Sequence, residues 1–260
     1  MTRTHLTFAC DGMTLFGTLD AGAQDTGLLI VSGGNEIRSG AWSGQAQLAA
    51  RLAAGGHPVF RFDRRGVGDS EGANGSFRTN REDIAAALAA FRAATPPLRR
   101  VIAFGNCDAA SALTLFAAGL ALDGLVLANP WTVDSEADGE PVQSPAGLRR
   151  RYLAKLSDPS EWRRLLGGKI ALGSAMRDIG RAAIPAPVSA LARDMQAGLA
   201  AFGGAATILL AERDRAAELF LDAWDPGDPR LRRYASAAHS FAEADAREWL
   251  FEQVLAALRT

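Results

Sequence analysis

The chain has 260 residues, of which 48% are hydrophobic and 22% are charged, and its formal net charge is −1. This length suits one large α/β domain, and the near-neutral charge argues against a nucleic-acid or anionic-membrane partner. Two cysteines and three histidines without zinc-type spacing predict no disulfide framework, no metal site and no cofactor. Because no apolar run has signal-peptide or transmembrane length, we expect a cytoplasmic protein without a membrane partner.

Short apolar strands alternate with helical patterns along most of the chain. The predicted strands are residues 4–8 and 13–19, joined by an Asp11-Gly12 turn, then 27–32, 58–62, the run from 101 into Cys107, 122–128, 206–211 and 231–235. The predicted helices are residues 44–54, 81–93, the segment after Cys107, a segment through Leu199, 216–223 and 242–258. This order predicts an α/β fold in one domain, residues 1–260, with a mostly parallel central sheet and helices on both faces.

The regular order is interrupted between residues 132 and 187. That segment has Arg-rich and Trp-containing helical patterns and no clear buried strand. We predict that it forms a helical cap inserted over the sheet. Trp131, directly before this segment, and Tyr152 and Trp162 within it are candidate substrate-binding residues. Aromatic residues at helical spacing are more often the core of such a cap.

The strongest functional signal is the sequence Gly105-Asn-Cys-Asp-Ala109, which ends an apolar β-branched run and opens a small-residue helix. A side chain on so sharp a turn points out above the sheet, and the helix N-terminus behind it favours a thiolate. Small residues on either side avoid a clash in the turn. The motif predicts a nucleophile elbow with Cys107 in place of serine, and a buried structural cysteine is the alternative.

A base and an orienting acid follow the elbow at later strand ends. His239 is the histidine that comes after the last strand, and Asp214 follows the strand at residues 206–211. The order Cys107, Asp214, His239 is the α/β-hydrolase order of nucleophile, acid and base. His239 would take the thiol proton and Asp214 would fix the imidazole tautomer. The alternatives are a surface histidine, an Asp214 that only caps a helix, and the rival acids Glu212 and Glu218.

Backbone donors for an oxyanion are expected in two places. One is the N–H of Asp108, directly after the nucleophile. The other belongs to the loop after the strand at residues 27–32, where Gly34 and Asn35 are both candidates. A further glycine-spaced loop at residues 63–72 is expected to hydrogen-bond its neighbours in a structural role. The alternative is that Arg64 of this loop faces the pocket.

Several longer motifs carry a family resemblance. They are Gly33-Gly34 with Arg38, residues 58–72, residues 105–111, residues 129–131, and Tyr152 with residues 162–167. In these the chain resembles the type-one hydrolase associated with the exosortase A system of exopolysaccharide-producing bacteria, an α/β-hydrolase. The resemblance implies an acyl hydrolase and makes Arg38 a candidate substrate-binding residue. Asn106, Ala109 and Asn35-Glu36 depart from common hydrolase patterns, which bears on the substrate rather than on the triad.

The leading hypothesis is covalent acyl chemistry. Cys107 would attack an ester or thioester of a small molecule, and water would hydrolyse the acyl-cysteine. We expect the protein to be a monomer or a homodimer. Since a thioester also passes its acyl group to an alcohol or amine, an acyltransferase is the alternative. A non-catalytic binding protein on the same fold is the alternative from another class and predicts an inert, buried Cys107. A dehydrogenase or kinase is disfavoured because the phosphate-binding loops are missing.

Overall fold

The computed structural model describes residues 2–133 and 188–260. Its centre is an eight-stranded sheet with the order β1-β2-β4-β3-β5-β6-β7-β8 among the described residues. The strands are β1 (Arg3–Cys10), β2 (Met13–Asp20), β3 (Thr26–Val31), β4 (Val59–Phe62), β5 (Arg100–Asn106), β6 (Gly124–Ala128), β7 (Ala205–Ala211) and β8 (Leu231–Tyr234). The helices are α1 (Gly44–Ala54), α2 (Arg81–Ala94), α3 (Asp108–Phe116), α7 (Ala190–Ala201), α8 (Arg215–Ala223) and α9 (Ala244–Arg259).

The sheet is parallel except at the edge where the chain begins. β1 and β2 form an antiparallel hairpin, and β2 also pairs antiparallel with β4, whereas the pairs from β4 to β8 are parallel. The hairpin turn has positive φ at both Asp11 (48°) and Gly12 (79°), which matches the twist of the strands that it joins. The predicted mostly parallel sheet with an edge hairpin is confirmed.

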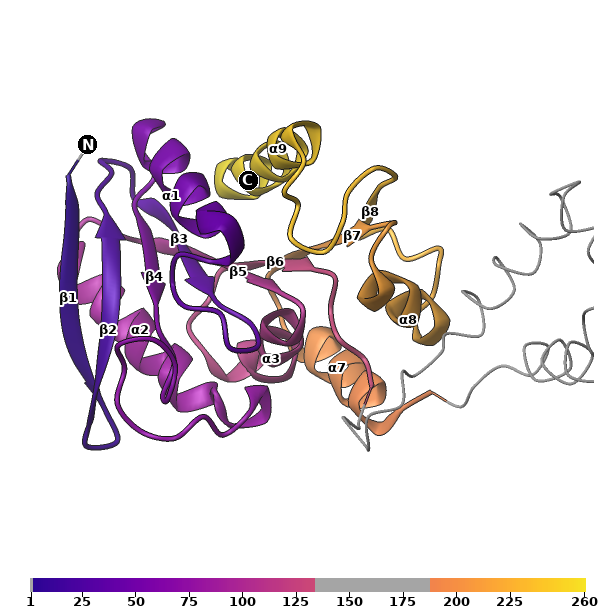
Figure 1. Ribbon diagram of the computed structural model, residues 1–260, viewed down its shortest axis with the longest axis horizontal. Coiled ribbons are helices and arrows are strands. Elements are labelled where there is room, and N and C mark those ends of the chain that lie inside the picture. The colour runs from indigo at the N-terminus through magenta and orange to yellow at the C-terminus, as the bar shows by residue number, and fades with distance from the viewer. Residues whose placement is uncertain (1, 134–187) are drawn as a thin grey trace, which may run out of the picture.

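Helices cover both faces of the sheet, as Figure 1 shows with α1 and α9 on one side and α2, α3 and α7 on the other. Successive residues of β3 alternate between the two cores. Leu28 and Ile30 pack with the core under α1 and α9, and Leu29 and Val31 pack with the core under α2, α3 and α7. Burial on both faces explains why the central strands are continuously apolar.

The predicted elements form with small differences at their ends. The strand expected from residue 122 begins at Gly124, because Asp123 sits in the preceding turn and accepts a hydrogen bond from the N–H of Val101 at 2.7 Å. The last helix begins at Ala244 instead of residue 242. Phe241, with φ of 51°, still belongs to the loop that carries His239.

The predicted cap falls almost entirely outside the described residues, as do Tyr152 and Trp162. Two segments mark where it joins the sheet. Thr132 follows β6, and its carbonyl accepts a hydrogen bond from Ser189 Oγ at 2.5 Å, directly before α7. In the described ranges, no helix is long and apolar enough to cross a membrane.

Candidate active site

Cys107 occupies a sharp turn between β5 and α3, with φ of 60° and ψ of −126°. A positive φ at a non-glycine residue is strained by about 1–3 kcal/mol and needs support from its surroundings. The support comes from the next strand: the N–H of Cys107 donates to the carbonyl of Ala128 at 2.9 Å, and the N–H of Trp131 donates to the carbonyl of Cys107 at 3.4 Å. The side chain is partly exposed. The turn thus has the geometry of the predicted elbow.

The small neighbours of Cys107 are required by contact distances. A Cβ at Gly105 would lie 2.8 Å from the carbonyl carbon of Ala109, which is closer than side chains tolerate. Ala109 itself is fully buried. A larger residue at either position would therefore push α3 away from β5 and move Cys107.

The structure brings the three predicted triad residues together. Asp214 follows β7, and its Oδ2 lies 2.7 Å from His239 Nδ1. The hydrogen bond to Asp214 first, and the interaction with the Cys107 side chain second, raise the pKa of His239 to about 10, although burial opposes the shift. At neutral pH the imidazole is therefore protonated, which suits an ion pair with a thiolate.

Asp214 has both of the roles considered for it. Its Oδ1 accepts a hydrogen bond from the N–H of Ala216 at 3.2 Å and so caps α8, while Oδ2 faces His239. In the described part of the chain it is Asp214, and neither Glu212 nor Glu218, that hydrogen-bonds His239. The N-cap hydrogen bond to Ala216 fixes the orientation of the Asp214 carboxylate, and the fixed carboxylate in turn orients the imidazole of His239.

Two asparagines hold the backbone of His239. Asn106 Nδ2 donates to the carbonyl of His239 at 3.1 Å, and Asn129 Nδ2 donates to the same carbonyl at 3.3 Å. Asn129 is fully buried, and its Oδ1 accepts from the N–H of Ala211 at 2.8 Å. These bonds of Asn106 and Asn129, called the Asn106–Asn129 clamp below, connect the ends of β5, β6 and β7 to the loop that carries His239. Sequence reasoning missed this role, although the position of both asparagines directly at strand ends was a usable signal.

The predicted oxyanion loop lies against the residue after the nucleophile. The N–H of Gly34 donates to Asp108 Oδ1 at 2.7 Å. A Cβ at Gly33 would sit 2.5 Å from the same oxygen, so glycine is needed there for the carboxylate to approach. Arg64, only 2% exposed, donates to the carbonyl of Gly34. Asn35 is exposed and its Oδ1 accepts from Asn74 at 2.7 Å.

The loop at residues 63–72 has the structural role expected of it. Asp63 accepts hydrogen bonds from the N–H groups of Arg38 (2.6 Å) and Asp69 (3.1 Å), and Ser70 Oγ donates to the carbonyl of Asp63 at 2.7 Å. The guanidinium of Arg38 also contacts Thr18 at 3.1 Å and Asp69 at 2.9 Å. These bonds make Arg38 a support between loops, and substrate binding by Arg38 stays a prediction.

Trp131 lies beside the elbow. It is half-buried against the core, and its indole N–H donates to the carbonyl of Val133 at 2.9 Å. Its carbonyl accepts from Ser111 Oγ, on α3, at 2.7 Å. The residue therefore braces the turn that presents Cys107, whatever else it contacts.

The other two histidines, His57 and His5, lie away from Cys107 and contact oxygen atoms of the protein. His57 is buried with Nδ1 2.9 Å from the carbonyl of Thr26, at the end of the sheet opposite the elbow. His5 Nδ1 lies 2.9 Å from Thr18 Oγ1 on the edge hairpin. Among the residues that the structure describes, no three His, Cys, Asp or Glu side chains group in a way that would hold a metal ion.

Several solved structures share the fold of this chain. A solved alpha/beta hydrolase, GrgF from Penicillium sp. sh18, has 18% identity and a TM-score of 0.66, with 100% of this chain and 98% of that chain covered. Esterase Pf2001 of Pyrococcus furiosus has 15% identity and a TM-score of 0.61, with 99% of this chain and 90% of that chain covered. Est1E of Butyrivibrio proteoclasticus, solved with bound ferulic acid, has 14% identity and a TM-score of 0.56, with 96% of this chain and 99% of that chain covered. At such low identities these similarities concern the fold.

No curated protein matches the chain. The family model for the alpha/beta hydrolase family, in contrast, matches residues 28–253. That range includes the elbow, Asp214 and His239 as well as most of the sheet. The chain therefore belongs to the alpha/beta hydrolase family.

Proposed function

We propose that this protein is a cysteine-dependent acyl hydrolase that acts on a small-molecule ester or thioester. The observation that carries the proposal is the Asp214–His239 hydrogen bond at the strand ends near Cys107, with the pKa of His239 raised to about 10 by Asp214 first and by Cys107 second. A protonated imidazole beside a thiol at a helix N-terminus is the environment that makes cysteine nucleophilic. The solved esterases of the same fold support the choice of substrate class.

In the acylation step the Cys107 thiolate forms a bond to the carbonyl carbon, and the negative charge moves to the carbonyl oxygen. Collapse of this intermediate breaks the bond to the alkoxide or thiolate leaving group, which receives its proton from His239. Asp214 holds Nδ1 throughout, so that Nε2 faces the reacting atoms. The product of this step is an acyl-cysteine and a neutral His239.

Hydrolysis then needs a base. Once Cys107 is acylated its negative charge is gone, and one of the interactions that raise the pKa of His239 is lost. The neutral imidazole takes a proton from water, whose oxygen attacks the acyl carbon, and the thiolate is expelled as the leaving group. The carboxylic acid departs and the resting ion pair is restored.

For the oxyanion, we propose the N–H groups of Asp108 and Gly34. Gly34 faces open space, since an added Cβ would meet nothing within 4 Å. In the resting enzyme its N–H is taken by the Asp108 carboxylate, so this carboxylate must turn aside when substrate binds. Arg64 offers it a new partner: its guanidinium already interacts with Asp108, and its buried Nε has no hydrogen-bond partner in the described ranges.

This assignment predicts that Asp108→Ala raises kcat/KM, by about threefold to tenfold, since a competing charge-assisted hydrogen bond is removed. The Asp69→Ala variant is the matched control, because that carboxylate supports the neighbouring loop without contacting Gly34. Steady-state kinetics on both variants give the comparison. A fall in kcat/KM for Asp108→Ala alone would instead assign the donor role to Asn35 and a supporting role to Asp108.

The experiment for the function itself is a turnover assay with p-nitrophenyl esters and acyl thioesters of increasing chain length. Release of free acid that disappears in Cys107→Ala supports a hydrolase. Product that appears only as an ester or amide, after an alcohol or amine is added, supports the acyltransferase. No turnover together with ligand binding that survives His239→Ala would favour the non-catalytic binding protein. The exosortase association, the cytoplasmic location and a monomeric or homodimeric state rest on the sequence and stay predictions.

A further inference from the structure

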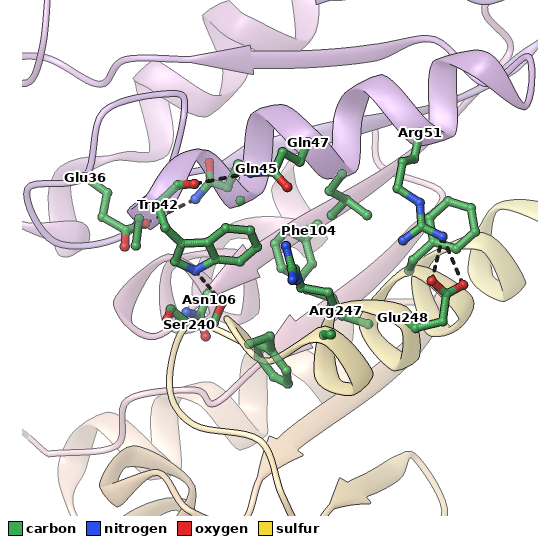
Figure 2. Close-up of a pocket in the computed structure, with 17 residues that line it drawn as sticks. Glu36, Trp42, Gln45, Gln47, Arg51, Phe104, Asn106, Ser240, Arg247 and Glu248 are labelled. Atoms are coloured by element: carbon green, nitrogen blue, oxygen red, sulfur yellow. Dashed lines mark hydrogen bonds and ion pairs between the residues drawn. The ribbon is translucent and has the colours of Figure 1, made fainter.

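A cavity of about 300 Å³ lies between α1 and α9, on the side of the sheet that these two helices cover (Figure 2). Phe104 of β5 contributes to its lining, together with Asn106 and Ser240. None of the three triad residues lines it. Its walls include Asn106 and Ser240, the chain neighbours of Cys107 and His239, so it lies next to the histidine loop. The proposed acyl chemistry makes no use of it.

The walls of the cavity are largely apolar and aromatic. Trp42, Leu48, Phe104, Leu250 and Phe251 all line it. Trp42 stands out because it is 38% exposed and has φ of 45° in the short helical turn before α1. Its indole N–H donates to the carbonyl of Ser240 at 3.3 Å, which holds the ring beside the cavity. A strained, partly exposed aromatic residue is a common feature of ligand sites.

The two arginines in the described part of the cavity wall, Arg51 and Arg247, differ in their ion pairs. Arg51 makes an ion pair with Glu248 at 2.8 Å and lies 3.8 Å above the ring of Phe251. Arg247 lies 5.3 Å above the ring of Trp42, and Figure 2 shows its side chain reaching from α9 toward α1. No carboxylate in residues 2–133 or 188–260 is within 4 Å of the Arg247 guanidinium, whereas Arg51, the other arginine of the cavity wall in these ranges, is paired with Glu248.

Glu36, the second carboxylate in the described part of the cavity wall, does not neutralise the positive charge of Arg247. Glu36 accepts a hydrogen bond from Gln45 at 3.2 Å, and burial is the main cause that raises its pKa. Figure 2 places Glu36 and Arg247 at different parts of the cavity, with Trp42 between them. The cavity thus combines an apolar body with one cation that lacks an anionic partner.

We propose that this cavity binds a small apolar monocarboxylate, with the carboxylate on Arg247 and the apolar part against Trp42 and Phe104. A planar guanidinium binds a carboxylate through two parallel hydrogen bonds, and an apolar surrounding strengthens them. A volume of about 300 Å³ lies at the lower end of the range of small-molecule pockets, which is roughly 300–1,000 Å³. The ligand is accordingly the size of phenylacetate or octanoate.

The test is calorimetric titration of phenylacetate and octanoate into the full-length Cys107→Ala protein. Because this variant lacks the nucleophile, the result does not depend on whether the proposed acyl hydrolysis is correct. We expect saturable binding of one ligand per chain. Phenylacetamide, which keeps the shape and lacks the charge, should bind at least about tenfold more weakly, the order expected for loss of a charge-assisted hydrogen bond.

Three further variants, each made in the Cys107→Ala background, assign the site. Arg247→Met should weaken phenylacetate binding at least about tenfold, Arg247→Lys should retain most of it, and Arg259→Met, an exposed arginine on the same helix, should leave it unchanged. Circular dichroism shows whether each variant is folded, and the lysine variant keeps the test valid if the methionine variant is not. Absence of saturable binding, or equal binding by the Arg247→Met and Arg259→Met variants, would overturn the proposal.

Discussion

The two cysteines of this chain occupy opposite chemical environments. Cys10 ends β1, is 6% exposed, and its Sγ lies 3.5 Å from Asp83 Oδ1. Burial first, and the charge of Asp83 second, raise the pKa of Cys10 to about 11. Cys107 lies at the N-terminus of α3, is partly exposed and interacts with His239, whose pKa is raised to about 10. The same side chain is thus an inert core residue in one place and a candidate nucleophile in the other, because of its neighbours alone.

The largest expected effect separates the two sites by function. Cys107→Ala should lower acyl turnover by about 10⁴-fold or more, as removal of a nucleophile does in related mechanisms. Cys10→Ala should keep turnover near the wild-type level, since that thiol lies in the core beneath the edge hairpin. Steady-state assays on both variants give the comparison. Equal losses would mean that neither thiol acts as the nucleophile.

Asp214→Asn should reduce turnover by about 10²- to 10⁴-fold, because an amide no longer stabilises the charged imidazole and favours the wrong tautomer. Asparagine is also a good helix N-cap, so α8 should remain in place. The melting temperature measures the cap, and kcat measures the triad. A normal kcat would transfer the orienting role to Glu212 or Glu218.

The two thiols should also alkylate differently with pH. In the wild-type protein we expect iodoacetamide to modify Cys107 at neutral pH and Cys10 only near pH 11 or after unfolding. His239→Ala removes the adjacent positive charge, so the pH at which Cys107 reacts should rise while that of Cys10 stays the same. Peptide-resolved mass spectrometry follows both in one sample. An unchanged profile for Cys107 would exclude its pairing with His239.

The smallest effect concerns stability. The pKa of His239 is about 10 in the folded protein, above its ordinary value of 6.5. A raised pKa means that the folded state binds the proton more tightly, so this contribution to stability is complete below about pH 6.5 and is lost as the pH rises through about 10. The difference in unfolding free energy between wild type and His239→Gln should shrink over that range. A constant difference from pH 6 to pH 10 would contradict the charged pair.

Much of the fold was predictable because it depends on local patterns. Apolar strands such as β3 and the tight turn at Gly105–Ala109 specify their conformation by burial and by steric limits. The proximity of Cys107, Asp214 and His239 was predictable from their order along the chain, since the carboxyl ends of parallel strands meet at one edge of the sheet. The Asn106–Asn129 clamp, the bond from Gly34 to Asp108 and the α1–α9 cavity were not. They bring together segments up to 133 positions apart in the sequence. They depend on tertiary packing, which the periodic pattern of apolar residues does not specify.

The most direct test of the central claim is mass spectrometry of tryptic peptides after brief exposure to an activated acyl ester and an acyl thioester. The account predicts an acyl group on Cys107, none on Cys10, and much less on Cys107 in His239→Ala. The adduct should decay in water with the release of acid. Turnover without any adduct on Cys107, or equal acylation of the two cysteines, would contradict a covalent mechanism at the elbow.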